Sequence, residues 1–269
     1  MGGIVSVIIP TYNRAALVTR ALMSALAQTY ADTEVVVVDD NSTDDTELAM
    51  AKYIGQSIYL KTPHRGRPAI PRNHGIQVAK GEWIAFLDDD DLWLPEKLKR
   101  QLDALQQTSC LASCTNAWRV TGGKRVGTYF GHKLPEIFDF DYLLKANMVI
   151  CSSVVIHRSL FDTVQGFPED EALKAIEDYA LWLRVATKTN FVYINEPLIE
   201  YTDEPSESIR KEDLSEYEQK RRLVRNFLVW AKFAHCPARY ASLVKGAWFK
   251  QALREFMRDL QRMIRKRHE

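Results

Sequence analysis

The sequence has few cysteines and no long hydrophobic run. Its four cysteines are Cys110, Cys114, Cys151 and Cys236. They are too few for a disulfide scaffold and fit no zinc-ligand spacing, so we expect buried, reduced thiols in a cytoplasmic protein. The longest apolar stretches, such as 35–38 and 227–231, are far shorter than the roughly 18 residues that span a membrane. Residues 1–5 lack a basic segment followed by an apolar one, so we expect no secretory signal.

Two nucleotide-binding motifs are also missing. There is no G-x-G-x-x-G pattern, which argues against a Rossmann dinucleotide site, and no G-x-x-x-x-G-K-[ST] pattern, which argues against a P-loop. Without a glycine-rich phosphate cradle, a metal ion would have to supply much of any diphosphate binding. The 12 glycines and 10 prolines are ordinary numbers, and they exclude collagen-like and low-complexity chains.

The charge is unevenly distributed, although the net charge is only +1. Residues 220–269 hold 14 Lys and Arg but 3 Asp and Glu, whereas residues 1–219 hold 22 and 32. From Arg239 onward, apolar residues recur every three or four positions among the basic ones, which predicts an amphipathic helix. We expect residues 239–269 to contact an anionic membrane surface; a helix packed on the acidic body is the alternative. No recognition motif accompanies the charge, so we expect no nucleic-acid partner.

Strands and helices alternate in the first part of the chain. Apolar runs predict strands at 4–9, 34–38, 57–60 and 82–87, with Pro10 ending the first. Helices are predicted at 14–28, 41–54, 71–80 and 95–107. This alternation is typical of an α/β fold whose mostly parallel sheet is covered on both faces. Further on, we expect a turn at Gly122-Gly123, helices at 138–146 and 177–187, and strands at 149–156 and 191–194.

Polar side chains follow three of the predicted strands. Thr11 and Tyr12 follow the first, Asp39 ends the second, and four consecutive aspartates, Asp88 to Asp91, follow the fourth. The carboxyl ends of parallel strands share one edge of a sheet, where ligands bind. Adjacent carboxylates repel one another unless water or a cation neutralises them, and oxygen ligands suit Mg²⁺ or Mn²⁺. The pattern therefore predicts a metal–diphosphate site; a solvated loop that caps the next helix is the alternative.

The order of these motifs resembles the family 2 glycosyltransferases, which have the GT-A fold. The segments that carry the resemblance are VSVIIPTYNR (5–14), VVVDDNSTD (36–44), RNHGI (72–76), GEWIAFLDDDD (81–91), CSSVVIHR (151–158), VQGF (164–167) and IEDYALWLR (176–184). The resemblance implies a GT-A domain at 1–202, with a donor-binding half at about 1–110 and an acceptor-binding half at about 111–202. Residues 203–269 lie outside it and are expected to form a basic helical extension.

The resemblance also implies a role for individual residues. Asp39 would accept a hydrogen bond from the base. Asp90 would be the metal ligand, in a register that the run of aspartates leaves open by one. Asp178 would be the general base, with Glu177 beside it at the start of a helix. The nucleotide-sugar site would be lined by Pro10, Thr11, Tyr12, Asp39, Arg72, Asp88 and Asp89.

The implied activity is an inverting, Mn²⁺- or Mg²⁺-dependent transfer of a sugar from a UDP-sugar to a hydroxyl of a glycan or lipid-linked glycan. Such an enzyme would serve bacterial surface polysaccharide assembly on the inner face of the cytoplasmic membrane. One alternative is a nucleotidyltransferase acting on a sugar phosphate, but the glycine-rich first loop of those enzymes is missing. The other is a non-catalytic glycan-binding relative, although Asp39, Asp90 and Asp178 are all present.

Overall fold

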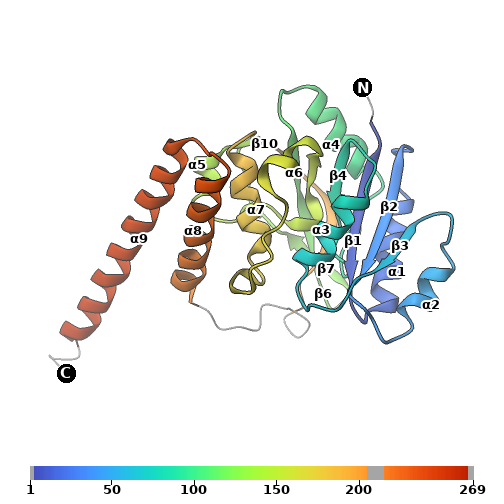
Figure 1. The fold of residues 1–269 in the computed structure, drawn as a ribbon, viewed down its shortest axis with the longest axis horizontal. Coiled ribbons are helices and arrows are strands. Elements are labelled where there is room, and N and C mark those ends of the chain that lie inside the picture. The colour runs from blue at the N-terminus through green and yellow to red at the C-terminus, as the bar shows by residue number, and fades with distance from the viewer. Residues whose placement is uncertain (1–2, 205–214, 266–269) are drawn as a thin grey trace. The chain divides into compact units, whose positions relative to one another are not determined.

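The structure is a computed structural model that describes residues 3–204 and 215–265, with side chains as far as residue 252. It divides into two units, Met1–Ser208 and Ile209–Glu269. The first unit holds a sheet with its covering helices, and the second holds two long helices (Figure 1).

A ten-stranded sheet runs through the first unit in the order β3-β2-β1-β4-β9-β6-β10-β5, with β7 paired to β6 and β8 to β10. The strands are β1 (Val5–Thr11), β2 (Thr33–Asp39), β3 (Ile58–Lys61), β4 (Trp83–Phe86), β5 (Leu92–Trp93), β6 (Ala112–Thr121), β7 (Lys124–Thr128), β8 (Ile137–Phe138), β9 (Val155–His157) and β10 (Phe191–Thr202). Because β9 is antiparallel to both β4 and β6, the strands β3, β2, β1, β4, β6 and β10 all point the same way. The predicted mostly parallel α/β sheet is confirmed.

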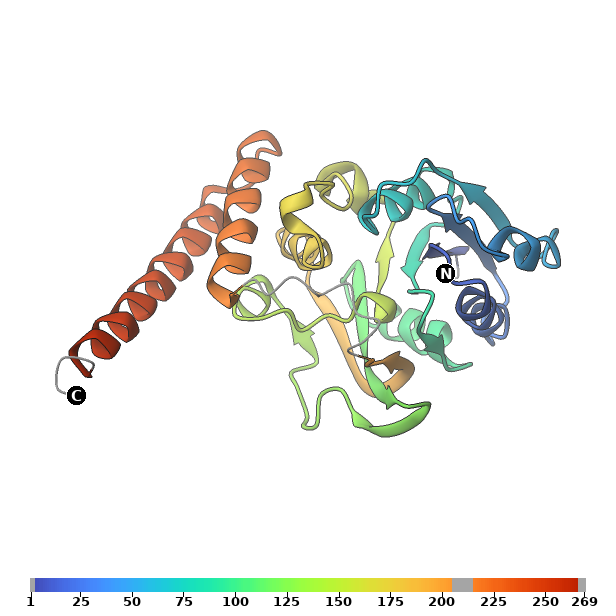
Figure 2. The same ribbon diagram turned by 90° about the horizontal axis from the view of Figure 1, so that it is seen from below.

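Helices cover both faces of this sheet (Figure 2). They are α1 (Ala15–Leu26), α2 (Thr46–Ala51), α3 (Ala69–Val78), α4 (Lys97–Gln106), α5 (Phe140–Leu143), α6 (Ser159–Val164) and α7 (Glu177–Ala186). Alternate residues of a strand point to opposite faces, and β1 shows this. Val7 shares one buried cluster with Leu22 of α1 and Leu102 of α4. Ile8 faces the other way and touches Gly75 of α3.

The predicted elements are confirmed with five corrections. The helix predicted at 41–54 shrinks to α2, because Asn41 has a φ of 64°, in the left-handed region, and lies outside the helix. The first strand does not end at Pro10 but continues to Thr11. The fixed φ of proline fits extended backbone, and Pro10 lies opposite Val38 in the parallel register although it has no N–H to donate. The segment 151–153 is a 3₁₀ turn, so the strand predicted at 149–156 shrinks to β9. The helix predicted at 138–146 shrinks to α5, because Phe138 pairs with β10 instead. The last strand extends far beyond 194, as β10 pairs with β6 through Thr202.

The second unit is an antiparallel pair of helices, α8 (Glu216–Phe233) and α9 (Ala238–Arg265). Phe227 and Trp230 of α8 and Val244 of α9 are buried, and the rings of Tyr217 and Trp248 lie 4.8 Å apart. The helix predicted from Arg239 is therefore confirmed. The side chains of 253–269, which complete the expected membrane-contacting segment, lie outside the described residues. In the part of the chain that the structure describes, none of the helices combines the length and the apolar character that crossing a bilayer requires.

We expect Gly75→Ala to lower the free energy of unfolding of the first unit by about 1–3 kcal/mol. The added Cβ would lie 2.5 Å from Cγ2 of the fully buried Ile8, and overpacking of a core outweighs the helix propensity that alanine adds. Gly246→Ala is the matched control, because that helical glycine has no atom within 4 Å of an added Cβ. Urea unfolding followed by circular dichroism measures both. Equal effects of the two substitutions would contradict the close packing of α3 on β1.

Candidate functional site

The aspartates after β4 meet the end of β1, as the parallel pairing of these strands requires. Thr11 Oγ1 donates to Asp89 Oδ2 over 2.7 Å. Arg14, from the turn between β1 and α1, places Nη1 at 2.9 Å from both Asp89 Oδ1 and Asp90 Oδ2. Asp91 Oδ1 accepts from the main-chain N–H of Thr202 over 2.8 Å, so this run also fixes the end of β10.

Burial and mutual repulsion make these carboxylates hard to ionise together. Burial raises the pKa of Asp89 to about 7, with Asp90 adding to the shift and Arg14 opposing it. Burial and the neighbouring Asp88 raise the pKa of Asp90. Burial, together with the neighbouring Asp90 and Asp88, raises the pKa of Asp91 well above its usual range. The protein's own cations therefore leave the cluster short of positive charge.

The donor set fits a divalent metal ion. Asp89 and Asp90 converge on a single nitrogen, which shows that one cation can touch both carboxylates. Within residues 3–204 and 215–252, no three acidic, His or Cys side chains form a closed metal cage. Mg²⁺ commonly takes one or two protein carboxylates and completes its shell with substrate phosphates and water. The carboxylate oxygens of Asp89 and Asp90, at the edge of the sheet, suit this kind of coordination.

Asp39 is fully buried at the end of β2, directly opposite Thr11 in the parallel register. Its Oδ1 accepts from the main-chain N–H and the hydroxyl of Ser42, over 2.8 and 2.6 Å. Its Oδ2 accepts from the hydroxyl of Tyr59 over 2.5 Å. A carboxylate oxygen accepts two hydrogen bonds, so Oδ2 keeps capacity for one further donor. Pro10 lies buried in β1, where it shapes the strand and offers no side-chain hydrogen bond.

Tyr12 follows β1 and presents a ring to solvent. It stacks on the ring of His64, with the centroids 4.1 Å apart and the planes at 22°. Asp40 holds the His64 loop: its carboxylate accepts from the main-chain N–H groups of Arg65 and Gly66, over 3.0 and 2.9 Å, and lies 2.9 Å from His64 Nδ1. A flat aromatic surface therefore lies next to Thr11, at the carboxyl end of β1.

Arg72 of α3 lies inside the protein, with 5% of its surface exposed. Its Nη2 donates to Asp88 Oδ1 over 2.6 Å, and its Nη1 donates to Glu177 Oε1 over 3.0 Å. Burial opposes its charge, but Asp88 and Glu177 help to raise the pKa of Arg72 well above its usual value. The guanidinium therefore joins the end of β4 to the first turn of α7.

Glu177 and Asp178 occupy different surroundings although they are neighbours in α7. Glu177 is 6% exposed, and one of its carboxylate oxygens is bound to Arg72. Asp178 is half-buried, and its Oδ2 accepts from Asn147 Nδ2 over 3.4 Å. A carboxylate in the first turn of a helix is stabilised in its ionised form. Of the two, Asp178 is the more exposed.

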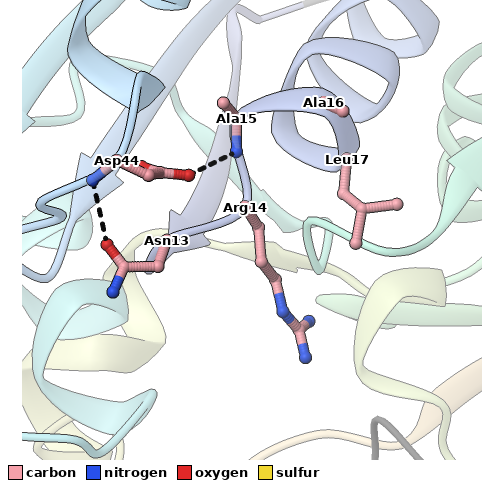
Figure 3. A pocket seen from close by; sticks show the side chains of 6 residues that line it. All are labelled: Asn13, Arg14, Ala15, Ala16, Leu17 and Asp44. Carbon is pink, nitrogen blue, oxygen red and sulfur yellow. Dashed lines mark hydrogen bonds between the residues drawn. The ribbon is translucent and has the colours of Figure 1, made fainter.

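A pocket of about 470 Å³ lies beside the turn between β1 and α1. Figure 3 shows its lining, with Asp44 turned to the N–H of Ala15 and Arg14 reaching away from them. The pocket is lined by Asn13, Arg14, Ala15, Ala16, Leu17 and Asp44. It therefore adjoins the carboxylate cluster through Arg14, and none of the site residues predicted from the sequence lines it.

The structure thus brings Thr11 to Asp89, and Arg72 to Asp88 and Glu177. Sequence reasoning missed Arg14, Tyr59 and His64. Arg14 is the last residue of the first motif and offered a signal, since a cation beside polar strand ends can pair with an acidic run. Tyr59 and His64 offered no such signal, because their partners belong to other segments of the chain: Asp39 in β2 and Tyr12 after β1.

Comparison with known proteins identifies the family. The model of the family described as glycosyl transferase family 2 matches residues 6–164, more than half of the chain. The chain belongs to glycosyl transferase family 2. The predicted resemblance is confirmed, and with it the expectation of a glycosyltransferase.

Relatives and solved structures agree with this assignment. The UDP-Glc:alpha-D-GlcNAc-diphosphoundecaprenol beta-1,3-glucosyltransferase WfgD of Escherichia coli is 32% identical over 193 residues, which are 71% of this chain and 73% of that protein. The putative teichuronic acid biosynthesis glycosyltransferase TuaG of Bacillus subtilis is 32% identical over 202 residues, 74% and 78% of the two chains. The structure of S. aureus TarS 1–349 in complex with UDP-GlcNAc superposes with a TM-score of 0.72 at 23% identity, covering 90% of this chain and 70% of that one. At that identity the superposition shows a common fold.

We expect Arg72→Met to lower the free energy of unfolding by about 3–5 kcal/mol, because it leaves the buried Glu177 without its counter-ion. Arg119→Met is the matched control: Arg119 forms an exposed ion pair with Asp203 at 2.8 Å, and its loss should cost no more than about 1 kcal/mol. Denaturant unfolding of both variants measures the difference. A loss for Arg72→Met as small as that of the control would show that the buried bridge contributes no stability.

Proposed function

We propose that this glycosyltransferase moves a sugar from a UDP-sugar to a hydroxyl of a lipid-linked glycan in bacterial surface polysaccharide assembly. The observation that carries the proposal is the meeting of Thr11, Asp89 and Asp90 at the carboxyl ends of β1 and β4. The names of the relatives support it, since the E. coli enzyme takes UDP-Glc and a diphosphoundecaprenol-linked acceptor. The fold is that of an enzyme seen with UDP-GlcNAc.

The donor would bind across the ends of β1, β2 and β4. The exposed ring of Tyr12 offers a face to the uracil, and the free capacity of Asp39 Oδ2 offers an acceptor for the base N–H. Because Asp39 is fully buried, a covering side chain must move before the base reaches it. Asp89 would contact the ribose or the sugar, and Asp90 would hold Mn²⁺ or Mg²⁺. When bound, the metal ion stabilises the negative charge on the leaving diphosphate.

The transfer itself would be one in-line displacement at the anomeric carbon. Asp178 takes the proton of the acceptor hydroxyl as its oxygen forms the new bond to that carbon. The bond from the same carbon to the diphosphate oxygen breaks, UDP leaves, and the configuration inverts. Glu177 then acts as a positioning residue, because its carboxylate is bound to Arg72 and holds the start of α7 beside Asp88.

The same proposal assigns the parts of the chain. The GT-A domain would comprise residues 1–202, with donor-binding and acceptor-binding halves that meet at about residue 110. Residues 203–269 would be the basic extension, and the protein would work in the cytoplasm on the inner face of the membrane. The mostly acidic first part and the basic last part support this division.

The helix pair supplies a surface for that membrane contact. Phe233 and Phe249 are each 69% exposed. Val229 precedes Phe233 by one helical turn of α8, and both are exposed. The same two helices carry exposed basic side chains: Lys232, Arg239, Lys245 and Lys250. Apolar side chains that enter the acyl boundary, flanked by cations that meet anionic headgroups, are typical of helices that lie on membranes.

We expect the protein to release UDP from one UDP-sugar in the presence of Mn²⁺ and a lipid-diphosphate-linked GlcNAc acceptor, and to stop when the metal is chelated. Asp178→Asn should lower the rate by about 10²–10⁴-fold with UDP affinity unchanged, because an amide takes no proton. Asp103→Asn, at an exposed carboxylate of α4, is the matched control and should keep the full rate. An Asp178→Asn variant that keeps its activity would refute the role of Asp178 as the base. Absence of UDP release from every UDP-sugar would refute the proposed reaction.

We expect the full-length protein to cosediment with vesicles that contain phosphatidylglycerol, and to be released by salt. Phe233→Ser and Phe249→Ser should each weaken this binding about tenfold, since each removes a large apolar side chain from the acyl boundary. Val126→Ser, at an exposed apolar residue of β7, is the control and should bind as the unaltered protein does. Equal binding to purely zwitterionic vesicles would contradict the role of the basic side chains.

A further inference from the structure

Arg14 holds the position that a metal ion would need. A single nitrogen, Nη1, lies 2.9 Å from a carboxylate oxygen of Asp89 and 2.9 Å from one of Asp90. Divalent ions of the Mg²⁺ size approach such oxygens to about 2.0–2.1 Å. An ion bound to this oxygen of Asp90 from the same side would therefore collide with the guanidinium and repel its charge. Arg14 and a metal ion therefore compete for Oδ2 of Asp90.

Other features describe the surroundings of Arg14. It occupies the position before α1, where it makes no side-chain capping hydrogen bond to the helix. Its side chain is 25% exposed, and it borders the pocket of about 470 Å³ beside the β1–α1 turn (Figure 3). The side chain thus has solvent and an open space beside it. Burial lowers the pKa of Arg14, but Asp89 and Asp90 outweigh this, so it stays charged.

We propose that Arg14 is the resident counter-cation of Asp89 and Asp90 in the donor-free enzyme, and that the metal-bound diphosphate of the donor displaces its guanidinium from Asp90. The displaced guanidinium then faces the diphosphate. This inference rests on the proposed metal-dependent donor site. Before the donor arrives, the arginine keeps two crowded carboxylates paired, and the arrival of the donor supplies a new anionic partner for it.

The exchange makes metal and donor bind cooperatively. A metal ion alone must displace Arg14 from Asp90 and supplies no anion in exchange, so it binds weakly. With the diphosphate present, the guanidinium regains an anion, so the same metal ion binds tightly. By linkage, the metal ion then strengthens donor binding by the same factor. Arg14 is therefore a positioning residue that couples the two ligands.

Binding of Mn²⁺ to the full-length protein, measured by the electron paramagnetic resonance signal of free Mn²⁺ with and without UDP, tests this coupling. Arg14→Met should bind Mn²⁺ alone about tenfold or more tightly than the unaltered protein, because the competing cation is gone. UDP should strengthen Mn²⁺ binding less in this variant. Arg14→Lys keeps a competing charge and should bind Mn²⁺ alone more weakly than Arg14→Met does.

Arg20→Met is the matched control, since Arg20 is an exposed residue of α1, and it should match the unaltered protein. Circular dichroism establishes that each variant is folded. Arg14→Met that binds Mn²⁺ alone no more tightly than the unaltered protein would overturn the proposal. Failure of the unaltered protein to bind Mn²⁺ even with UDP is a separate result, which overturns the metal-dependent donor site on which the proposal rests.

Discussion

Repulsion among the carboxylates that follow β4 is the constraint on which the rest of the site depends. Asp88 to Asp91 lie at the edge where three parallel strands end, and three of them are raised in pKa by burial and by one another. Two arginines offset part of this charge from opposite faces of the sheet. Arg14, before α1, binds Asp89 and Asp90, and Arg72, in α3, binds Asp88. The parallel order β2-β1-β4 makes both arrangements possible.

Arg72 also gives two neighbouring acids different surroundings. Successive residues of a helix point about 100° apart, so Glu177 and Asp178 cannot share an environment. Glu177 turns inward to Arg72 and ties α7 to the end of β4. Asp178 turns toward Asn147 and is half-buried. In the proposed transfer, Asp178 would be a half-buried base that its neighbour holds in place, which suits a single displacement in which proton transfer and bond formation coincide.

The parallel strands could be predicted from the sequence because each is marked by a short run of neighbouring residues. Each of the runs in β1, β2 and β4 is apolar and buried, and each ends in polar residues, so their convergence follows from parallel pairing. Side-chain partners are a different matter: Arg14 meets Asp89 across 75 positions, and Arg72 meets Glu177 across 105. Lys97 shows the same limit, since it looks like a surface residue of α4 yet lies fully buried over the ring of Trp93. Contacts of this kind depend on register and packing, which no short pattern encodes.

The most direct test is a crystal structure of the protein with UDP and Mn²⁺, with anomalous scattering measured at the manganese edge. We predict one manganese peak at Asp90, with the diphosphate beside it, the uracil beside Tyr12 and Arg14 withdrawn from Asp90. A diphosphate bound away from the ends of β1 and β4, or a nucleotide complex with Arg14 still on both carboxylates and manganese elsewhere, would contradict it.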